Sequence, residues 1–323
     1  MESVWYAQHP ASYALMPLGW LYRGCASLRK LAYTSGLLSS YSAEVPVVIV
    51  GNITSGGTGK TPLVIWLVRY FRSLGYSPGV VARGYRGRAT RWPQQVRPDS
   101  DPAVVGDEPI IIARRALCPV AVGPRRADAV EALLKHSDCD IIISDDGLQH
   151  YALERNFEIA VLDGVRRVGN GRSLPAGPLR EPAERLTSVD LVVTNGIAGR
   201  GEFSMKYVSS IARKLNSHEE VALSDFSPKE VNAVAGIGNP ERFFSMLRAK
   251  GLRVTAHRFR DHVRYQKKDF EFGNDLPILM TEKDAVKCEH LGLSRCWSVP
   301  IAAELPAVFE KRLSIVFGGA DNG

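Results

Sequence analysis

A glycine-rich segment at 51–61 ends in a lysine and a threonine, Lys60 and Thr61. Glycines let backbone N–H groups close around phosphate oxygens, the lysine can reach the β- and γ-phosphates of a nucleotide, and the threonine hydroxyl suits Mg²⁺. The strict pattern has glycine where Thr54 stands, so this is the Gly-Gly variant of the loop. An incidental glycine-rich turn would leave Thr61 unexplained. We expect nucleotide contacts at Thr54, Ser55, Gly56, Gly57, Thr58, Gly59, Lys60 and Thr61.

Two pairs of adjacent carboxylates are the second chemical signal. Asp145 and Asp146 end the apolar run 139–144, and Asp107 and Glu108 lie in a Gly-Asp-Glu-Pro turn. Adjacent carboxylates repel each other unless a cation is near, and an acid that ends a strand beside a phosphate loop can hold Mg²⁺. Aspartates that cap turns are the alternative. The metal ligands that we expect are Thr61, Asp146, Asp145 and Glu108.

Hydrophobic patterning identifies the elements that must position these residues. The apolar run 45–50 precedes the loop as a buried strand, and 63–71 follows it in helical register. Strand-like and helical segments then alternate, at 79–82, 139–145, 157–163, 190–195, 230–236, 240–250 and 276–281. The alternation predicts an α/β fold with a P-loop NTPase-type parallel sheet, helices on both of its faces, and a second, smaller α/β lobe.

The length of 323 residues suggests two domains, and a hydrophobic content of 45% is enough to form their cores. We expect an N-terminal helical segment at 1–40 and a phosphate-loop core at 41–155. A second lobe at 156–310 would close over the site, and 311–323 would form a C-terminal tail. The site should then lie between the lobes, at the carboxyl ends of strands.

Charge and cysteine content exclude some classes of protein. The net charge of +7 suits anionic partners such as phosphates, nucleic acid or anionic lipid, without choosing among them. The five cysteines are odd in number and include no Cys-x-x-Cys pair. Neither a disulfide framework nor a zinc knuckle fits this pattern, and a reducing compartment is the default.

The first forty residues are apolar and aromatic without forming a clean membrane span. Pro10 and Pro17 interrupt the uncharged stretch 4–22, and a span needs about 20 mostly apolar residues. From Leu18 onward the apolar residues recur at helical spacing, with arginine and lysine between them. Such a helix suits a membrane interface, but a helix packed on the protein's own core shows the same pattern. Both interpretations remain open at this point.

An ordered series of motifs closely resembles the tetraacyldisaccharide 4′-kinase family, the lipid A 4′-kinases of Gram-negative bacteria. The resemblance extends from about Trp5 to about Leu305. The series comprises Gly51-Asn52, Gly56-Gly57-Thr58-Gly59-Lys60-Thr61-Pro62, Arg83-Gly84-Tyr85, Gly106-Asp107-Glu108-Pro109, Asp145-Asp146-Gly147-Leu148-Gln149-His150, Pro175 to Pro182, Gly236-Ile237-Gly238-Asn239-Pro240, Asp261-His262 and Thr281 to Lys287. Two positions depart from the family pattern: Leu148 replaces a usual phenylalanine, and Pro124-Arg125 replaces a usual Lys-Asp.

The resemblance implies an ATP- and Mg²⁺-dependent kinase. Its reaction is the transfer of the ATP γ-phosphate to the 4′-hydroxyl of a tetraacylated glucosamine disaccharide 1-phosphate, a step of lipid A biosynthesis. It also implies a location on the cytoplasmic face of the inner membrane, held by the N-terminal segment 1–40. We expect the lipid-linked disaccharide and the membrane surface as partners, and neither nucleic acid nor an obligate protein partner.

The resemblance also assigns catalytic roles. It makes Asp107 the base that takes the sugar hydroxyl proton and His262 its partner in a dyad, although His262 alone would read as an ordinary surface histidine. Lys60 would act on the phosphates. Arg180, between two prolines that restrain its loop, would contact phosphate with its bidentate guanidinium. Closure of the lobes on ATP would bring His262 toward Asp107.

Two other functions fit parts of the sequence. A P-loop GTPase or ATPase with a switch or insertion role would use the same loop, but the Thr-Glu-Lys-Asp sequence at 281–284 has its lysine in the wrong place for reading guanine. A non-catalytic membrane or nucleic-acid binding protein would use the basic excess. It would leave the phosphate loop and the paired carboxylates without a purpose.

Overall fold

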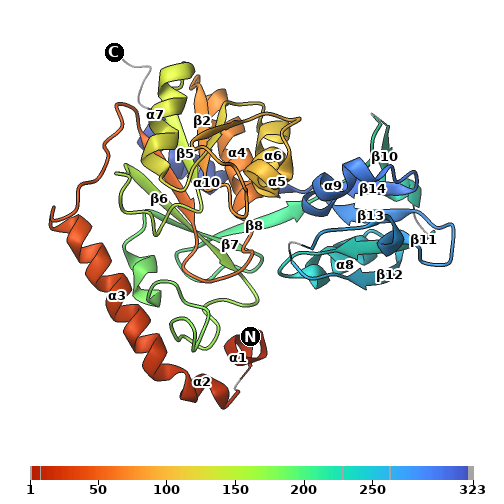
Figure 1. The fold of residues 1–323 in the computed structure, drawn as a ribbon, viewed down its shortest axis with the longest axis horizontal. Helices are drawn as coiled ribbons and strands as arrows, with labels where there is room; N and C mark the ends of the chain where they lie inside the picture. The colour runs from red at the N-terminus through yellow and green to blue at the C-terminus, as the bar shows by residue number, and fades with distance from the viewer. Residues whose placement is uncertain (1, 8, 218, 227–228, 262, 319–323) are drawn as a thin grey trace.

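The computed structural model describes residues 2–7, 9–217, 219–226, 229–261 and 263–318, which form two lobes side by side (Figure 1). The larger lobe is built on a nine-stranded sheet with the order β15-β8-β7-β6-β1-β5-β2-β4-β3. Its strands are β1 (Val47–Gly51), β2 (Pro78–Ala82), β3 (Gln94–Val96), β4 (Val120–Val122), β5 (Ile141–Asp145), β6 (Phe157–Asp163), β7 (Leu191–Asn195), β8 (Phe203–Val208) and β15 (Ala302–Glu304). All neighbouring pairs are parallel except β3–β4 and β8–β15 at the two edges.

Helices cover both faces of this sheet, as the sequence predicted. The central strand β1 is buried along its whole length, which explains its continuous run of apolar residues. One face packs against α4 (Lys60–Ser73), α6 (Asp107–Ala116) and α10 (Ala307–Phe317). The other face packs against α7 (Arg126–His136). The short helix α5 (Pro102–Val105) precedes α6.

The smaller lobe has a six-stranded sheet of its own, with the order β10-β9-β14-β13-β11-β12. Its strands are β9 (Ile211–Lys214), β10 (Glu220–Ala222), β11 (Glu230–Ala235), β12 (Arg253–Arg258), β13 (Ile278–Thr281) and β14 (Cys296–Val299). Its helices are α8 (Pro240–Ala249) and α9 (Glu282–Cys288). Separate apolar clusters fill this lobe, so the predicted second α/β lobe is present.

The division between the lobes differs from the predicted boundary near 155. Strand β6 pairs directly with β1, and β7 and β8 extend the same sheet, so the larger lobe continues to β8. The chain returns to this lobe through β15 and α10, where Phe309 packs on Trp66 and Phe203. The segment predicted as a tail from 311 is therefore helical and part of the core through Phe317. The cause of both differences is that sequence patterns do not show which strands pair.

The N-terminal segment forms α1 (Glu2–Tyr6), α2 (Ala11–Ala14) and α3 (Met16–Thr34), and α3 lies along one side of the larger lobe (Figure 1). The Trp5 indole N–H donates to the Pro175 carbonyl at 3.0 Å, which ties α1 to the loop before Arg180. Large apolar side chains on α3 remain exposed, namely Leu18, Trp20, Leu21, Leu28 and Leu31. Among the described residues, no helix combines the length and the hydropathy that crossing a membrane requires.

Gly51 provides a test of the close packing where β1 meets the phosphate loop. A Cβ at this position would lie 2.7 Å from Leu148 Cγ and 2.9 Å from the Leu148 backbone nitrogen. We expect Gly51→Ala to lower the free energy of unfolding by about 2 kcal/mol, because the backbone must shift to relieve this overlap. Urea denaturation measures the change. As a control, Gly24→Ala on the exposed side of α3 meets no atom within 4 Å and should raise stability by up to about 1 kcal/mol.

Candidate active site

The phosphate loop connects the carboxyl end of β1 to the first residue of α4, Lys60. Gly56 and Gly59 have φ angles of 108° and 101°, in the region that side chains rarely adopt. A Cβ on Gly59 would lie only 1.9 Å from Tyr207 Oη. The glycines are therefore required by backbone conformation and by close packing, and the strand–loop–helix arrangement predicted from the sequence is confirmed. Such a loop presents its N–H groups at a helix N-terminus, which suits phosphate.

The Lys60 side chain is held by two partners. Its ammonium donates to Asn52 Oδ1 at 3.2 Å and lies 3.3 Å from Asp146 Oδ1. Asn52 is completely buried, and its amide nitrogen donates to the Gly56 carbonyl at 3.2 Å, so the same side chain holds both the loop and the lysine. The sequence analysis did not assign Asn52 a role. The only signal was its place in the first motif of the series.

Asp145 and Asp146 end the strand next to β1, where Asp145 is the Cα partner of Val50. They differ in environment. Burial, together with the nearby charge of Glu108, raises the pKa of Asp145 to about 7, and its Oδ1 is buried without a hydrogen-bond partner among the described residues. Burial alone would also raise the pKa of Asp146, but Lys60 and Arg180 outweigh it and hold this pKa well below the ordinary range.

Arg180 reaches this site on a loop that is joined to the phosphate loop by two backbone hydrogen bonds. Its backbone N–H donates to the Ile53 carbonyl at 2.7 Å, and the Ser55 N–H donates to the Pro178 carbonyl at the same distance. The guanidinium Nη1 is 3.1 Å from Asp146 Oδ1. The Pro/Gly-rich stretch 169–182 is therefore a part of the site, and it places the predicted Arg180 beside the predicted Asp146.

Asp107 and Glu108 form the first turn of α6, so both acids complement the positive end of that helix. Asp107 is only 8% exposed, and one of its carboxylate oxygens accepts the Glu108 N–H at 3.0 Å. The Glu108 carboxylate accepts a hydrogen bond from Lys283 of the second lobe at 3.0 Å. The predicted dyad partner His262 lies outside the described residues. Its neighbour Asp261 has a carboxylate oxygen 3.3 Å from the same Lys283 ammonium.

A further polar group lies on the opposite side of the phosphate loop, at the carboxyl ends of β6 and β7. The Asn195 amide donates to the Thr58 carbonyl at 3.2 Å, and Arg242 of α8 forms an ion pair of 3.1 Å with Asp163. Arg166 donates to the Gly238 carbonyl in the second lobe at 2.9 Å. The sequence analysis missed these residues. The signal that could have found them is their position at the ends of strands beside β1.

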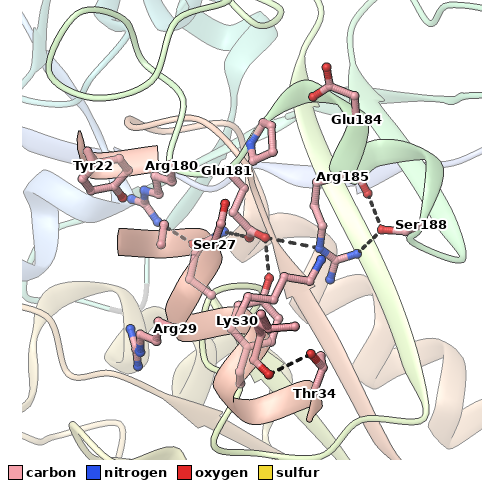
Figure 2. A pocket seen from close by; sticks show the side chains of 15 residues that line it. Tyr22, Ser27, Arg29, Lys30, Thr34, Arg180, Glu181, Glu184, Arg185 and Ser188 are labelled. Atoms are coloured by element: carbon pink, nitrogen blue, oxygen red, sulfur yellow. Dashed lines mark hydrogen bonds and ion pairs between the residues drawn. The ribbon is translucent and has the colours of Figure 1, made fainter. Parts of the chain in front are cut away.

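Two cavities are lined by residues of the candidate site. One, of about 450 Å³, lies between α3 and the loop that carries Arg180, and Figure 2 shows Tyr22, Lys30, Arg180 and Glu181 around it. The other, of about 1060 Å³, lies between the lobes and is lined in part by Asp107. Arg180 thus connects the first cavity to Asp146, and Asp107 lines the second cavity.

A P-loop beside a strand that ends in paired acids, with further acids and an arginine facing it, defines a nucleotide-dependent phosphotransferase. The family model described as tetraacyldisaccharide-1-P 4′-kinase matches residues 11–317, and the chain belongs to this family.

Similar proteins agree with this assignment. The tetraacyldisaccharide 4′-kinase of Nitrosococcus oceani is 52% identical over 94% of this chain and 90% of its own length. That of Hahella chejuensis is 45% identical over 97% and 95%. Among solved structures, LpxK from Aquifex aeolicus in complex with ATP is 26% identical, with a TM-score of 0.77 over 95% of this chain and 99% of its own.

The raised pKa of Asp145 predicts a pH-dependent stability. Between pH 3.8 and about 7 the unfolded chain ionises this carboxyl while the folded protein keeps it protonated. The free energy of unfolding of the wild type should therefore fall by roughly 4 kcal/mol relative to Asp145→Asn as pH rises through this window. Urea denaturation across the window measures it. Asp138→Asn, at an exposed position, serves as the control, and a constant difference between wild type and Asp145→Asn would contradict the prediction.

Proposed function

We propose that this protein uses ATP to phosphorylate the 4′-hydroxyl of a tetraacylated glucosamine disaccharide 1-phosphate, a step of lipid A biosynthesis. The observation that carries the proposal is the position of Asp146, which joins the phosphate-loop lysine Lys60 to Arg180. The Asp146 carboxylate therefore contacts both the phosphate loop, which would bind ATP, and the loop that carries Arg180 beside the cavity at α3. Membership of the 4′-kinase family identifies the acceptor.

In the proposed reaction, the 4′-oxygen attacks the γ-phosphorus of ATP. A new P–O bond forms, the bond to the β–γ bridging oxygen breaks, and ADP leaves with that electron pair. Asp107 takes the hydroxyl proton, with His262 as its partner. Backbone N–H groups of Gly56 to Gly59 and the Lys60 ammonium hold the phosphates, and Arg180 neutralises charge as it develops. Such a transfer depends mainly on position and charge, and these residues supply both.

The residues at the end of β5 fit Mg²⁺. A buried Asp145 oxygen without a hydrogen-bond partner among the described residues, the ionised Asp146 and the Thr61 hydroxyl provide hard oxygen donors. In the described part of the chain, no three metal-binding side chains form a closed cage, which accords with an ion that is held partly by phosphates and water. We assign the ion to Thr61 and Asp146, with Asp145 or Glu108 nearby. It would neutralise charge on the β- and γ-phosphates.

The GTPase alternative is not favoured. Within the Thr-Glu-Lys-Asp sequence at 281–284, Asp284 is completely buried, and its carboxylate accepts the Gly236 N–H at 2.9 Å and the Thr281 hydroxyl at 2.7 Å. These bonds hold the start of the Gly236–Pro240 loop inside the second lobe. Asp284, the acid that would have to recognise guanine, therefore forms its hydrogen bonds within the second lobe instead.

We further propose that α3 attaches the protein to the cytoplasmic face of the inner membrane. Leu21 and Leu28, which are 65% and 67% exposed, lie seven residues apart on one face of α3. Tyr22 and Arg29, also seven apart, face the cavity beside Arg180. Exposed leucines and basic residues on one helix suit an interfacial position, and the cavity face then opens toward a lipid-linked substrate.

Transfer of labelled γ-phosphate to the disaccharide lipid, in detergent with Mg²⁺, tests the reaction. We expect wild-type protein to label the lipid and both Lys60→Ala and Asp107→Ala to lose activity by about 100-fold or more. If Arg180 binds phosphate through both nitrogens of its guanidinium, Arg180→Lys will not restore the activity that Arg180→Ala loses. Release of free phosphate that needs Lys60, without lipid label, would refute the proposed acceptor.

Binding to vesicles that contain anionic lipid tests the role of α3. The double variant Leu21→Glu and Leu28→Glu should lose most of its binding, because it places two charges on the proposed apolar face. The double variant Val308→Glu and Ile315→Glu, which adds two charges at similarly exposed apolar positions seven residues apart on α10, is the matched control and should bind as wild type does. Equal binding by the double variant on α3 would disprove the attachment.

A further inference from the structure

The contact between α6 of the larger lobe and α9 of the smaller lobe carries a row of interlobe ion pairs. Figure 1 shows α9 beside α6 at the junction of the lobes. At the carboxyl end of α6, Arg114 donates to Glu289 at 2.9 Å and Arg115 donates to Glu282 at 2.7 Å. At the amino end, beside Asp107, the contact is made by Lys283. The row therefore extends from the outer surface to the candidate base.

Lys283 differs from the other members of the row in what surrounds it. Its ammonium lies 3.0 Å from Glu108 Oε1 and 3.3 Å from Asp261 Oδ1, so it joins an acid of α6 to an acid of the second lobe. Only 16% of its side chain is exposed. Burial alone would lower the pKa of Lys283, but Glu108, Asp107 and Asp261 together raise it. The ammonium is thus the positive charge shared by three carboxylates of two lobes.

The charges explain why this lysine matters for the relative position of the lobes. Without it, Asp107 and Glu108 on one lobe would face Asp261 on the other, and like charges in a partly buried cleft repel each other strongly. Removal of one member of a buried ionic group is costly because its partners lose a charge that stabilises them. The segment that follows Asp261 is the one expected to bring the dyad partner to Asp107.

We propose that Lys283 is a positioning residue for phosphoryl transfer, which holds Asp261 of the smaller lobe beside the amino end of α6. It acts through Asp107, Glu108 and Asp261, and it needs no contact with ATP or with the lipid. This inference rests on the proposed function for its catalytic consequence, whereas its structural consequence, the separation of the lobes, is independent of the substrate.

The test compares Lys283→Met with Lys283→Arg and with Lys268→Met, which changes an exposed lysine of the same lobe. We expect Lys283→Met to lower kcat by about 100-fold, the scale of a small misplacement of catalytic groups, with the KM for ATP nearly unchanged. Lys283→Arg should recover most of the rate because it keeps the charge. The Lys268→Met control should behave as wild type.

The distance between the lobes is the second measurement. Spin labels on cysteines placed at Lys250 and Lys311, one exposed position on each lobe, report it in a Cys25→Ser background. Lys283→Met should shift the distance distribution to longer values, and Lys283→Arg should shift it back. Should Lys283→Met fail to fold, Glu108→Gln removes the partner of Lys283 on the larger lobe and should shift the distance distribution in the same direction.

Two results would overturn the inference. One is a wild-type kcat and distance distribution for Lys283→Met. The other is an equal loss of rate in the Met and Arg variants without any change in distance, because the lysine would then act by direct contact. If the wild type itself transfers no phosphate to the lipid, the proposed function fails, and the distance measurement still decides whether Lys283 holds the lobes together.

Discussion

The pairing of β1 with β5 is the constraint on which the site depends. These parallel strands are neighbours in the sheet, so the phosphate loop that leaves β1 and the two aspartates that end β5 emerge at the same edge. Lys60 at the start of α4 then reaches Asp146 without any long connection. The loop at 169–182 and the first turn of α6 are added around this edge. Their side chains lie close together because the carboxyl ends of β1 and β5 lie side by side.

One consequence of this arrangement is that the pKa values of the two neighbouring aspartates shift in opposite directions. Asp146 lies between two cations and stays ionised, whereas Asp145 is buried behind it with a pKa near 7. Two cations make the difference, since the Lys60 ammonium lies 3.3 Å and the Arg180 guanidinium 3.1 Å from Asp146 Oδ1. The metal site that we propose here thus combines one ionised carboxylate with one carboxyl whose charge depends on its surroundings.

Local features of the sequence predicted the loop, the strands beside it and the second lobe. The contact between Arg180 and Asp146 was not predicted. Contacts between distant segments were not predictable. Asn52 carries no chemical signature apart from its neighbours, and Lys283 is 175 positions from Glu108, so only the folded chain brings them together. The boundary near 155 failed for the same reason. Apolar runs identify strands, but the pairing of β6 with β1 is a property of the whole sheet.

The two cavities differ in which lobes supply their lining residues. The N-terminal helix α3 contributes Tyr22 and Lys30 to the cavity beside Arg180, and it belongs to the lobe that carries the phosphate loop, so acceptor and donor can be held by a single body. The cavity beside Asp107 is instead divided between the lobes. With Asp107 as the proposed base, proton removal would be the part of the reaction that depends on how the lobes meet.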